Sequence, residues 1–487
     1  MDTVCSVRGL TLLVAIPALL AGCTNTPVPL DSEAHNQLIE RDRSDKAAYE
    51  NQTIELDLKQ AIERAVANNL DARVAEYQVL SQKRDVTVRE LEALPSLRTS
   101  RGVTERSNVG ASSSMSVISG LQSLEPSQST DRRRLVTEMS ASWNMMDAVV
   151  TLVDADRMKT ETSIAGTRYA KVVQNIERDV YAAYWRAYAY GNSNRQTTAL
   201  LNEARSQIKK YETAAGRNNI SVDEVGQKIA EISGRMRTLQ ETNVRIASSE
   251  SELKALLNYP QSVRLELKRP PQNLDAIRSV MKSGIIDQEW AALKARPEMR
   301  EEVLQKNAAI NNIHQEILKT FPGLELLANN HYDSNSFLED HSWNDYSVSI
   351  VQNVLNIFTL PARFQAAEEK ENLGDVRRSA LNAAIVAQVN LGKLRLHQSW
   401  EAWNDSREIT NMAQKSAKAK QAKASAGFVS GADVLNTRMD AQIETLRGSM
   451  AMADLQDAYA AMVNTMGQEL DPSSLEPRTI TAREVTP

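Results

Sequence analysis

Apolar residues at helical spacing open each half of the chain, and a proline ends both patterns. Leucine, isoleucine, valine and alanine recur three or four positions apart over residues 58–94, and Pro95 follows. This spacing predicts a helix of about 37 residues. A comparable pattern covers residues 287–319, and Pro322 stands shortly after it. The two patterns therefore predict two long helices with matching ends.

A pair of strand-like stretches follows each proline. The two members of a pair are separated by a loop rich in Ser, Asn, Asp or Gly, and Trp143 or Trp343 lies in or near the second member. The strands are predicted at residues 97–106, 135–145, 324–332 and 346–354. A very long helix comes next in both halves, so the chain is interpreted as one helix–strand–strand–helix–helix unit used twice.

The long helices are predicted over residues 147–214 and 362–425, without an internal proline. At 1.5 Å per residue each would extend about 100 Å. The second helix has one apolar stripe with the four-and-three spacing of a coiled-coil seam and another stripe beside it. The seam comprises Ala380, Ala384, Ala387, Leu391 and Leu394, and the neighbouring stripe comprises Leu381, Ile385 and Val389. Two stripes predict two neighbouring helices, as in the wall of a cylinder, and the alternative is an alanine-rich helix in solvent.

Each long helix ends at a glycine turn, over residues 215–223 and 426–435. Glycine accommodates the positive φ of a helix C-terminus, and a serine shortly afterwards can cap the next helix. Asp223 and Asp433 then fall in the first turn of that helix, where its dipole favours an acid. The two turns predict the tips of two helical hairpins at the same end of the molecule, and the alternative is a capped turn that binds no partner.

Composition and charge exclude several classes of protein. Only 5% of the 487 residues are aromatic and 18 are glycine, which favours long helical packing over several ordinary cores. The formal charge of −5 leaves no basic tract for nucleic acid. Of the two cysteines, Cys5 and Cys23, at most one remains after the processing described next, so neither a disulfide framework nor a cysteine-based zinc site is expected.

The N-terminus is typical of a secretory signal peptide. Residues 10–20 are mostly apolar but too few to span a bilayer as a stable helix. The segment ends in LAGC at residues 20–23, which resembles the bacterial lipobox, so we expect residues 1–22 to be removed and Cys23 to carry acyl chains, palmitate among them. Cys23 would then anchor a polar leader, residues 23–53, in a membrane. The alternative is cleavage without lipidation.

The order of elements as a whole resembles the TolC family of outer-membrane efflux channels, over about residues 54–470. The predicted parts are a first repeat at 54–258, a connector at 259–286, a second repeat at 287–470 and a polar C-terminal tail at 471–487. The segments that carry the resemblance are Leu58–Asn69, Arg296-Pro297-Glu298, the two proline stops, Trp143–Asp147, Asn356–Phe358, Tyr184-Trp185 and the tip Gly427–Leu435.

The resemblance implies a mainly α-helical homotrimer with a small membrane β-sheet. Four strands per subunit would form a 12-stranded β-barrel in the outer membrane of a Gram-negative bacterium, above a periplasmic barrel of long α-helices. The far tips would meet a periplasmic adaptor protein and an inner-membrane pump, making the trimer the exit duct of a tripartite efflux or secretion system. A membrane-spanning sheet must also close into a barrel on physical grounds, because the backbone groups along its edges cannot remain unpaired in lipid.

Carboxylates near the tips are the candidate gate of such a tunnel. In the resemblance Asp433 matches a ring of aspartates at the constriction, where three carboxylates near one axis would restrict the opening and favour cations. Asn436 stands one helical turn later, where the family often has a second acid, and Asp223 is the corresponding acid of the first tip. The alternative role for Asp433 is to interact with the positive end of its helix dipole.

Small residues at the tips are candidate positions for adaptor docking, because they allow a partner hairpin to approach the backbone. They are Gly216, Ser221, Val225, Gly427, Ser430 and Val434. The alternative is packing within the subunit. Separately, Arg132–Arg134 lie near the outer end of the second predicted strand. Their guanidinium groups could donate hydrogen bonds to lipid phosphates there, and the alternative is that they form a solvated rim.

Enzyme signatures are missing from the sequence. The five histidines form no i, i+4 pair, and no phosphate-binding glycine loop or nucleophile elbow occurs. The sequence therefore predicts no enzyme, no metal and no cofactor other than the lipid on Cys23. Two other classes remain as alternatives: a lipid-anchored coiled-coil scaffold, and a periplasmic adaptor, which would have one hairpin rather than two.

Overall fold

The computed structural model describes residues 32–123, 125–216, 221–470 and 477–479. The expected signal peptide, Cys23 and the centre of the first tip lie outside these residues. The chain divides into two compact units. One comprises Met1–Ile54 with Tyr259–Leu265, and the other comprises Glu55–Asn258 with Glu266–Pro487.

The smaller unit contains a helix that the sequence pattern does not predict, α2 (Ser32–Ala47), within the polar leader. This helix lacks an apolar stripe, so no periodic pattern of apolar residues in the sequence indicates it. Near its end, Tyr49 contacts Tyr259 edge-on, with ring centroids 5.4 Å apart. The Arg264 backbone N–H donates a 2.9 Å hydrogen bond to the Gln52 carbonyl.

The remaining elements follow the predicted order in both halves of the chain. The first half contains β1 (Thr53–Leu56), α3 (Leu58–Asn68), α4 (Leu70–Leu91), β2 (Ser96–Glu105), β3 (Ala111–Ser112), β4 (Ser127–Gln128), β5 (Arg133–Asn144), α5 (Met145–Gly216) and α6 (Val222–Leu256). The second half contains β6 (Arg264–Leu267), α7 (Leu274–Lys282), α8 (Ile285–Ala295), α9 (Pro297–Leu318), β7 (Gly323–Asp333), β8 (Ser342–Val351), α10 (Asn356–Ser425), α11 (Gly431–Thr465), β9 (Gln468–Leu470) and β10 (Pro477–Thr479). The predicted fold class, a mainly helical chain with one small sheet and a duplicated unit, is confirmed.

Two predicted helices are each broken in two, and the prediction of single helices over 58–94 and 287–319 is wrong. Asn69 has an extended ψ of 133°, and its side chain accepts hydrogen bonds from the next turn, so it caps α4. Arg296 has a ψ of 129° because Pro297 disfavours helical geometry in the residue before it. Proline suits the first position of α9.

The predicted connector and tail also contain regular structure. The segment 259–286 carries β6 and α7, and β6 pairs with β1. Within the tail, β10 pairs antiparallel with β9. Neither segment is therefore merely a linker.

The two long helices are longer than predicted, with 72 residues in α5 and 70 in α10. Pro361 lies inside α10, which corrects the expected start at residue 362. Little more than one helical turn precedes Pro361, so the ring disturbs few helical hydrogen bonds. At 1.5 Å per residue each helix extends about 105 Å.

The core of the larger unit lies between its two long hairpins. Helix α11 packs against α10, α5 and α6. The shared apolar cluster comprises Leu200, Leu201, Ala204, Ile232, Leu239, Leu435, Met439, Ile443 and Leu446. Two ion pairs cross between the hairpins, Arg235–Asp440 and Arg438–Glu203, each with an N–O distance of 2.9 Å. The hairpins therefore form one packed body.

Buried tyrosines attach the shorter elements to α5. The Tyr184 hydroxyl donates toward two backbone carbonyls, Leu56 O at 2.9 Å and Lys268 O at 2.7 Å. Burial raises the pKa of Tyr184, so the group stays protonated. One turn earlier, the Tyr181 hydroxyl donates to Gln456 Oε1 at 2.6 Å. These bonds fix α5 against both halves of the chain.

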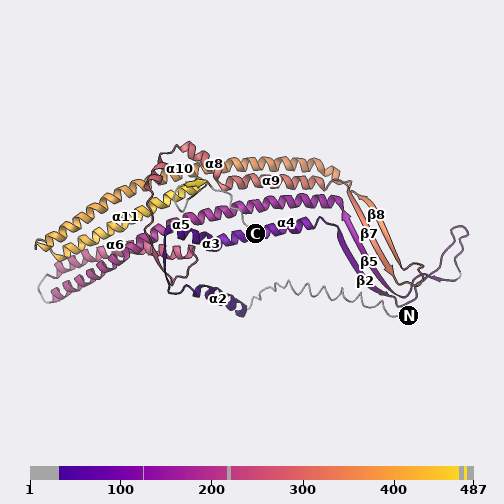
Figure 1. The fold of residues 1–487 in the computed structure, drawn as a ribbon, viewed down its shortest axis with the longest axis horizontal. Helices are drawn as coiled ribbons and strands as arrows, with labels where there is room; N and C mark the ends of the chain where they lie inside the picture. The colour runs from indigo at the N-terminus through magenta and orange to yellow at the C-terminus, as the bar shows by residue number, and fades with distance from the viewer. Residues whose placement is uncertain (1–31, 124, 217–220, 471–476, 480–487) are drawn as a thin grey trace. The chain divides into compact units, whose positions relative to one another are not determined.

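The long strands form one antiparallel sheet in the order β2-β5-β7-β8. Each repeat supplies one adjacent pair, and β5 pairs with β7 to join the two repeats. Within the larger unit the sheet lies at one end of the long helices and the hairpin tips lie at the other (Figure 1). Among the described residues, no helix combines the length and apolar content needed to cross a lipid bilayer.

Candidate functional site

The four-stranded sheet has two faces of opposite character. Residues that pair directly across neighbouring strands point to the same face, and the face alternates along each strand. By the observed register, one side carries Leu97, Met139, Ala141, Trp143, Leu324, Leu326, Ala328, Tyr346, Val348 and Ile350. We call this side the apolar face. The other side, the polar face, carries Arg98, Ser100, Arg134, Glu138, Ser140, Glu325, Asn329, His331, Asp333, Asp345, Ser347 and Ser349, with Val136, Leu327, Trp343 and Val351 among them.

The apolar face is uncovered in the single chain. Tyr346, Val348 and Ile350 are 79%, 71% and 75% exposed. Adjacent large apolar side chains at this exposure indicate a surface that is covered by a partner or by lipid.

The polar face carries an ion pair and a histidine–carboxylate contact. The Arg134 guanidinium lies 2.7 Å from the Asp333 carboxylate, and His331 lies 2.8 Å from Asp345. His331 also stacks on Trp343, with ring centroids 5.1 Å apart. Arg134 is therefore ion-paired within the sheet, and the two alternatives for the arginine run, lipid phosphate and solvated rim, stay predictions. A face with this composition is suited to contact water.

The outer strands of the sheet, β2 and β8, each have one neighbour in the chain. Their other edges present backbone N–H and C=O groups without a ladder partner from the sheet. Such edges pair with further strands unless they are blocked. The sheet can therefore be extended on both sides.

The long helix α10 likewise has an uncovered flank. Ile385 and Val389 of the predicted neighbouring stripe are buried within the chain. All five positions of the predicted seam, from Ala380 to Leu394, are exposed. One of the two predicted neighbours thus belongs to this chain, and no helix of the described residues covers the seam.

At the second tip, Asp433 takes part in a cap and a weak link between hairpins. The Ser430 hydroxyl accepts from the Asp433 backbone N–H at 3.2 Å and donates to the Asp433 carboxylate at 2.7 Å. The Lys228 ammonium of α6 lies 4.0 Å from the same carboxylate. The dipole-cap role considered for Asp433 is therefore present, and its carboxylate stays partly exposed.

Three of the predicted site residues have buried side chains. Asn436 is 4% exposed, and its Oδ1 accepts no hydrogen bond from the described residues. Val225 and Val434 are 5% and 6% exposed. They are buried because α11 packs against α5 and α6 and turns these side chains into the core. Their roles in a gate and in docking stay predictions. Packing within the subunit, the alternative, is what the structure has.

The other predicted tip residues lie at the surface or at the edge of the described region. Ser221, Asp223 and Ser430 have surface positions, with Gln227 Nε2 donating to Asp223 at 3.2 Å. Gly216 is the last residue of α5. Gly427 has a φ of 82°, and the Phe428 N–H closes the helix end on Lys423 O at 3.0 Å. Glycine is needed there because other residues disfavour this φ.

Sequence reasoning missed two apolar tip residues. Phe428 is 82% exposed beside Gly427, and Val222 is 75% exposed at the start of α6. Phe428 could have been found, since a phenylalanine in a glycine-rich turn has no helix to pack against. Both tips therefore present an apolar side chain.

Within the described ranges there is no cluster of three or more His, Cys, Asp or Glu side chains placed to hold a metal ion. His341 and His331, ten positions apart, make separate contacts: the former meets the Asp333 carbonyl at 3.0 Å.

No protein-family model matches the chain, and no curated protein matches its sequence. Solved structures do share its fold. The Campylobacter jejuni CmeC outer membrane channel has a TM-score of 0.62 at 9% identity, covering 87% of this chain and 87% of that one. A membrane protein from Pseudomonas aeruginosa has 0.61 at 11%, covering 84% and 92%. The Neisseria gonorrhoeae MtrE outer membrane channel has 0.57 at 14%, covering 83% and 88%. The chain has the fold of these proteins over most of its length.

Proposed function

We propose that the chain is one subunit of a homotrimeric channel in the outer membrane of a Gram-negative bacterium, the exit duct of a tripartite efflux or secretion system. The observation that carries the proposal is the two-faced sheet with open edges at one end of helices about 105 Å long. The shared fold with outer-membrane channels supports the same conclusion.

The sheet explains why several copies are needed. In lipid every backbone polar group must be paired, so a sheet with two open edges must close with other strands. Four strands per chain in three copies would give a barrel of twelve. The apolar face would then contact lipid, and the polar face would line the water-filled interior.

The long helices of neighbouring subunits would pack side by side into a closed ring. The exposed seam from Ala380 to Leu394 on α10 would receive a helix of the neighbouring subunit. Its alanines allow the two backbones to approach closely. The result would be a periplasmic tunnel that continues the barrel and ends at the tips.

The tips would contact the partners. A periplasmic adaptor would dock around Gly427, Phe428 and Ser430, where an exposed aromatic ring stands beside small residues. The adaptor would connect the trimer to an inner-membrane pump, and acyl chains on Cys23 would add a lipid anchor. Conduction by diffusion requires no catalytic group, and none is part of the proposal.

The function is tested by assembly, conductance and export. Full-length protein extracted from outer membranes is expected to be a trimer in native mass spectrometry and to form ion channels in planar bilayers. Deleting its gene should raise the accumulation of an exported compound in cells. A folded monomer whose strands remain outside lipid would contradict the proposal and favour a lipid-anchored coiled-coil scaffold.

The gate is tested at Asp433. Replacing Asp433 with Asn keeps a hydrogen-bonding side chain at the cap but removes the negative charge and the link to Lys228. We expect a higher resting conductance, because the two hairpins are held less tightly, and a lower preference for cations, because the acidic ring is lost. Single-channel recordings in planar bilayers measure both quantities.

Asp440→Asn is the matched control, since Asp440 also pairs across the hairpins but lies two turns further from the tip. It should leave ion selectivity unchanged. If Asp433→Asn channels match the original in conductance and selectivity, Asp433 only caps its helix.

A further inference from the structure

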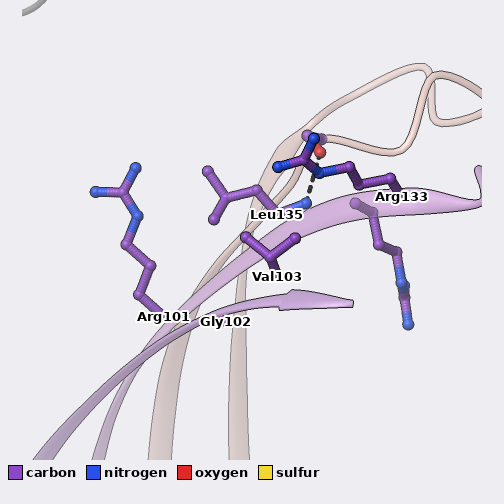
Figure 2. A pocket seen from close by; sticks show the side chains of 7 residues that line it. Arg101, Gly102, Val103, Arg133 and Leu135 are labelled. Atoms are coloured by element: carbon purple, nitrogen blue, oxygen red, sulfur yellow. Dashed lines mark hydrogen bonds between the residues drawn. The ribbon is translucent and has the colours of Figure 1, made fainter. Parts of the chain in front are cut away.

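Two arginines project from the apolar face near the end of the sheet that lies away from the helices. Arg101 of β2 and Arg133 of β5 lie on this face with Val103 and Leu135 between them, as Figure 2 shows. The register fixes their positions: Arg101 faces Thr137, and Arg133 faces Glu105. They line a cavity of about 540 Å³ together with Gly102, Val103, Leu135, Ser334 and a third arginine, Arg134. The cavity therefore combines Val103 and Leu135 with three arginines, of which Arg101 and Arg133 lie on the apolar face.

These arginines have little to neutralise them within the chain. Among the described residues Arg101 forms no hydrogen bond or ion pair. Arg133 reaches Glu105 only at 4.0 Å, and both side chains are largely exposed, so this pair contributes little. Arg134 differs, because it lies on the polar face and pairs with Asp333 at 2.7 Å. The positive charge on the apolar face is thus available to a ligand.

The register also gives the level of Arg101 in the sheet. It lies in one row with Thr137, Tyr332 and Ser342. The rows nearer the helices carry the apolar band from Leu97 to Ile350. Tyrosine and polar residues next to an apolar band are typical of the boundary between hydrocarbon and headgroups. Arg101 and Arg133 are therefore at headgroup level if the sheet spans a membrane.

We infer that Arg101 and Arg133 form a binding site for a glycolipid of the outer leaflet that carries two phosphates, such as lipid A. This inference rests on the proposed function, which makes the apolar face contact lipid and turns this end of the sheet toward the cell surface. Each guanidinium donates paired hydrogen bonds to one phosphate. The side chains of Val103 and Leu135 separate the two arginines, and the acyl chains lie over the apolar band on the other side of Arg101. Two cations on one face favour a lipid with two phosphates over one with a single phosphate.

The experiment measures lipid binding to the full-length trimer extracted from outer membranes. The probe is lipid A with two phosphates, and the competitors are lipid A with one phosphate and phosphatidylglycerol. The test variant is Arg101→Gln/Arg133→Gln, and Arg98→Gln is the matched control, because Arg98 lies on the polar face of the same strand. Native mass spectrometry gives the bound fraction at each lipid concentration.

We expect the double variant to bind the two-phosphate lipid at least about tenfold more weakly, and Arg98→Gln to bind it normally. Arg101→Lys/Arg133→Lys should bind at an intermediate level, since lysine retains the charge but not the paired geometry. Equal binding by the double variant, or equal affinity of the trimer for phosphatidylglycerol, would overturn the site.

Trimer content and channel conductance are measured on the same samples. Trimers that conduct but bind the lipid independently of both arginines would refute the site alone. If the unmodified protein formed no trimers and no conducting channels, the proposed function would be refuted, and the lipid site with it.

Discussion

A lysine in place of Val348 is expected to prevent assembly of the channel. Val348 lies in one row with Leu326 and Trp143, within the apolar band, and its side chain is 71% exposed in the single chain. A lysine facing lipid near the middle of a barrel costs roughly 2 to 4 kcal/mol. Three subunits would each bear this cost. Trimers in outer-membrane fractions, detected by heat-modifiable migration in gels, should fall to a small fraction of the normal amount.

The matched control is lysine at the next position. Ser347→Lys places the same charge on the polar face, where the register puts it beside Leu327 and where water would solvate it. This variant should assemble normally, although it can change ion selectivity. Normal assembly of Val348→Lys would show that the apolar face does not contact lipid, and equal loss in both variants would show that the strand tolerates no lysine on either face.

The strands show how far alternation along the chain predicts a sheet. All four lie within a few residues of their expected positions, because proline stops and alternating residues mark them locally. The start of β8 at Ser342 was missed, since Asn344 and Asp345 give that stretch no apolar signal. The pairing of β5 with β7 joins residues about two hundred positions apart, and no local pattern specifies it.

The arginines illustrate the same limit. Arg98 and Arg101 make the alternation of β2 irregular in the sequence. The register resolves this, since Arg98 lies on the polar face and Arg101 lies on the apolar face, in one row with Tyr332 at the edge of the apolar band. Sequence reasoning could identify the positive charge but could not assign it to a face.

The tips were predictable as turns but not as surfaces. Glycine and serine mark the turn before α11 because their backbone and capping preferences are local. Burial of Val225, Val434 and Asn436 depends on α11 packing against α5 and α6, which are distant in the chain. A small or polar residue near a turn therefore predicts the turn better than it predicts a partner.

Replacing Gly467 with alanine is expected to destabilise the larger unit strongly. Gly467 follows α11 with a φ of 70°, which costs an alanine about 1 to 2 kcal/mol. A Cβ at this position would also lie 2.6 Å from Arg296 N and 2.7 Å from Ala295 C. These are backbone atoms at the junction of α8 and α9, which cannot rotate away, so overpacking adds roughly 1 to 3 kcal/mol. The midpoint of thermal unfolding, followed by circular dichroism, should fall clearly.

Gly427→Ala separates the two causes. Gly427 also has a positive φ, of 82°, but no neighbouring atom lies within 4 Å of the position of its Cβ. This variant should lose only the backbone contribution, so its unfolding midpoint should fall less than that of Gly467→Ala. Equal decreases would mean that the end of α11 can move away from Arg296. The close contact between Gly467 and the junction of α8 and α9 would then not be a fixed part of the fold.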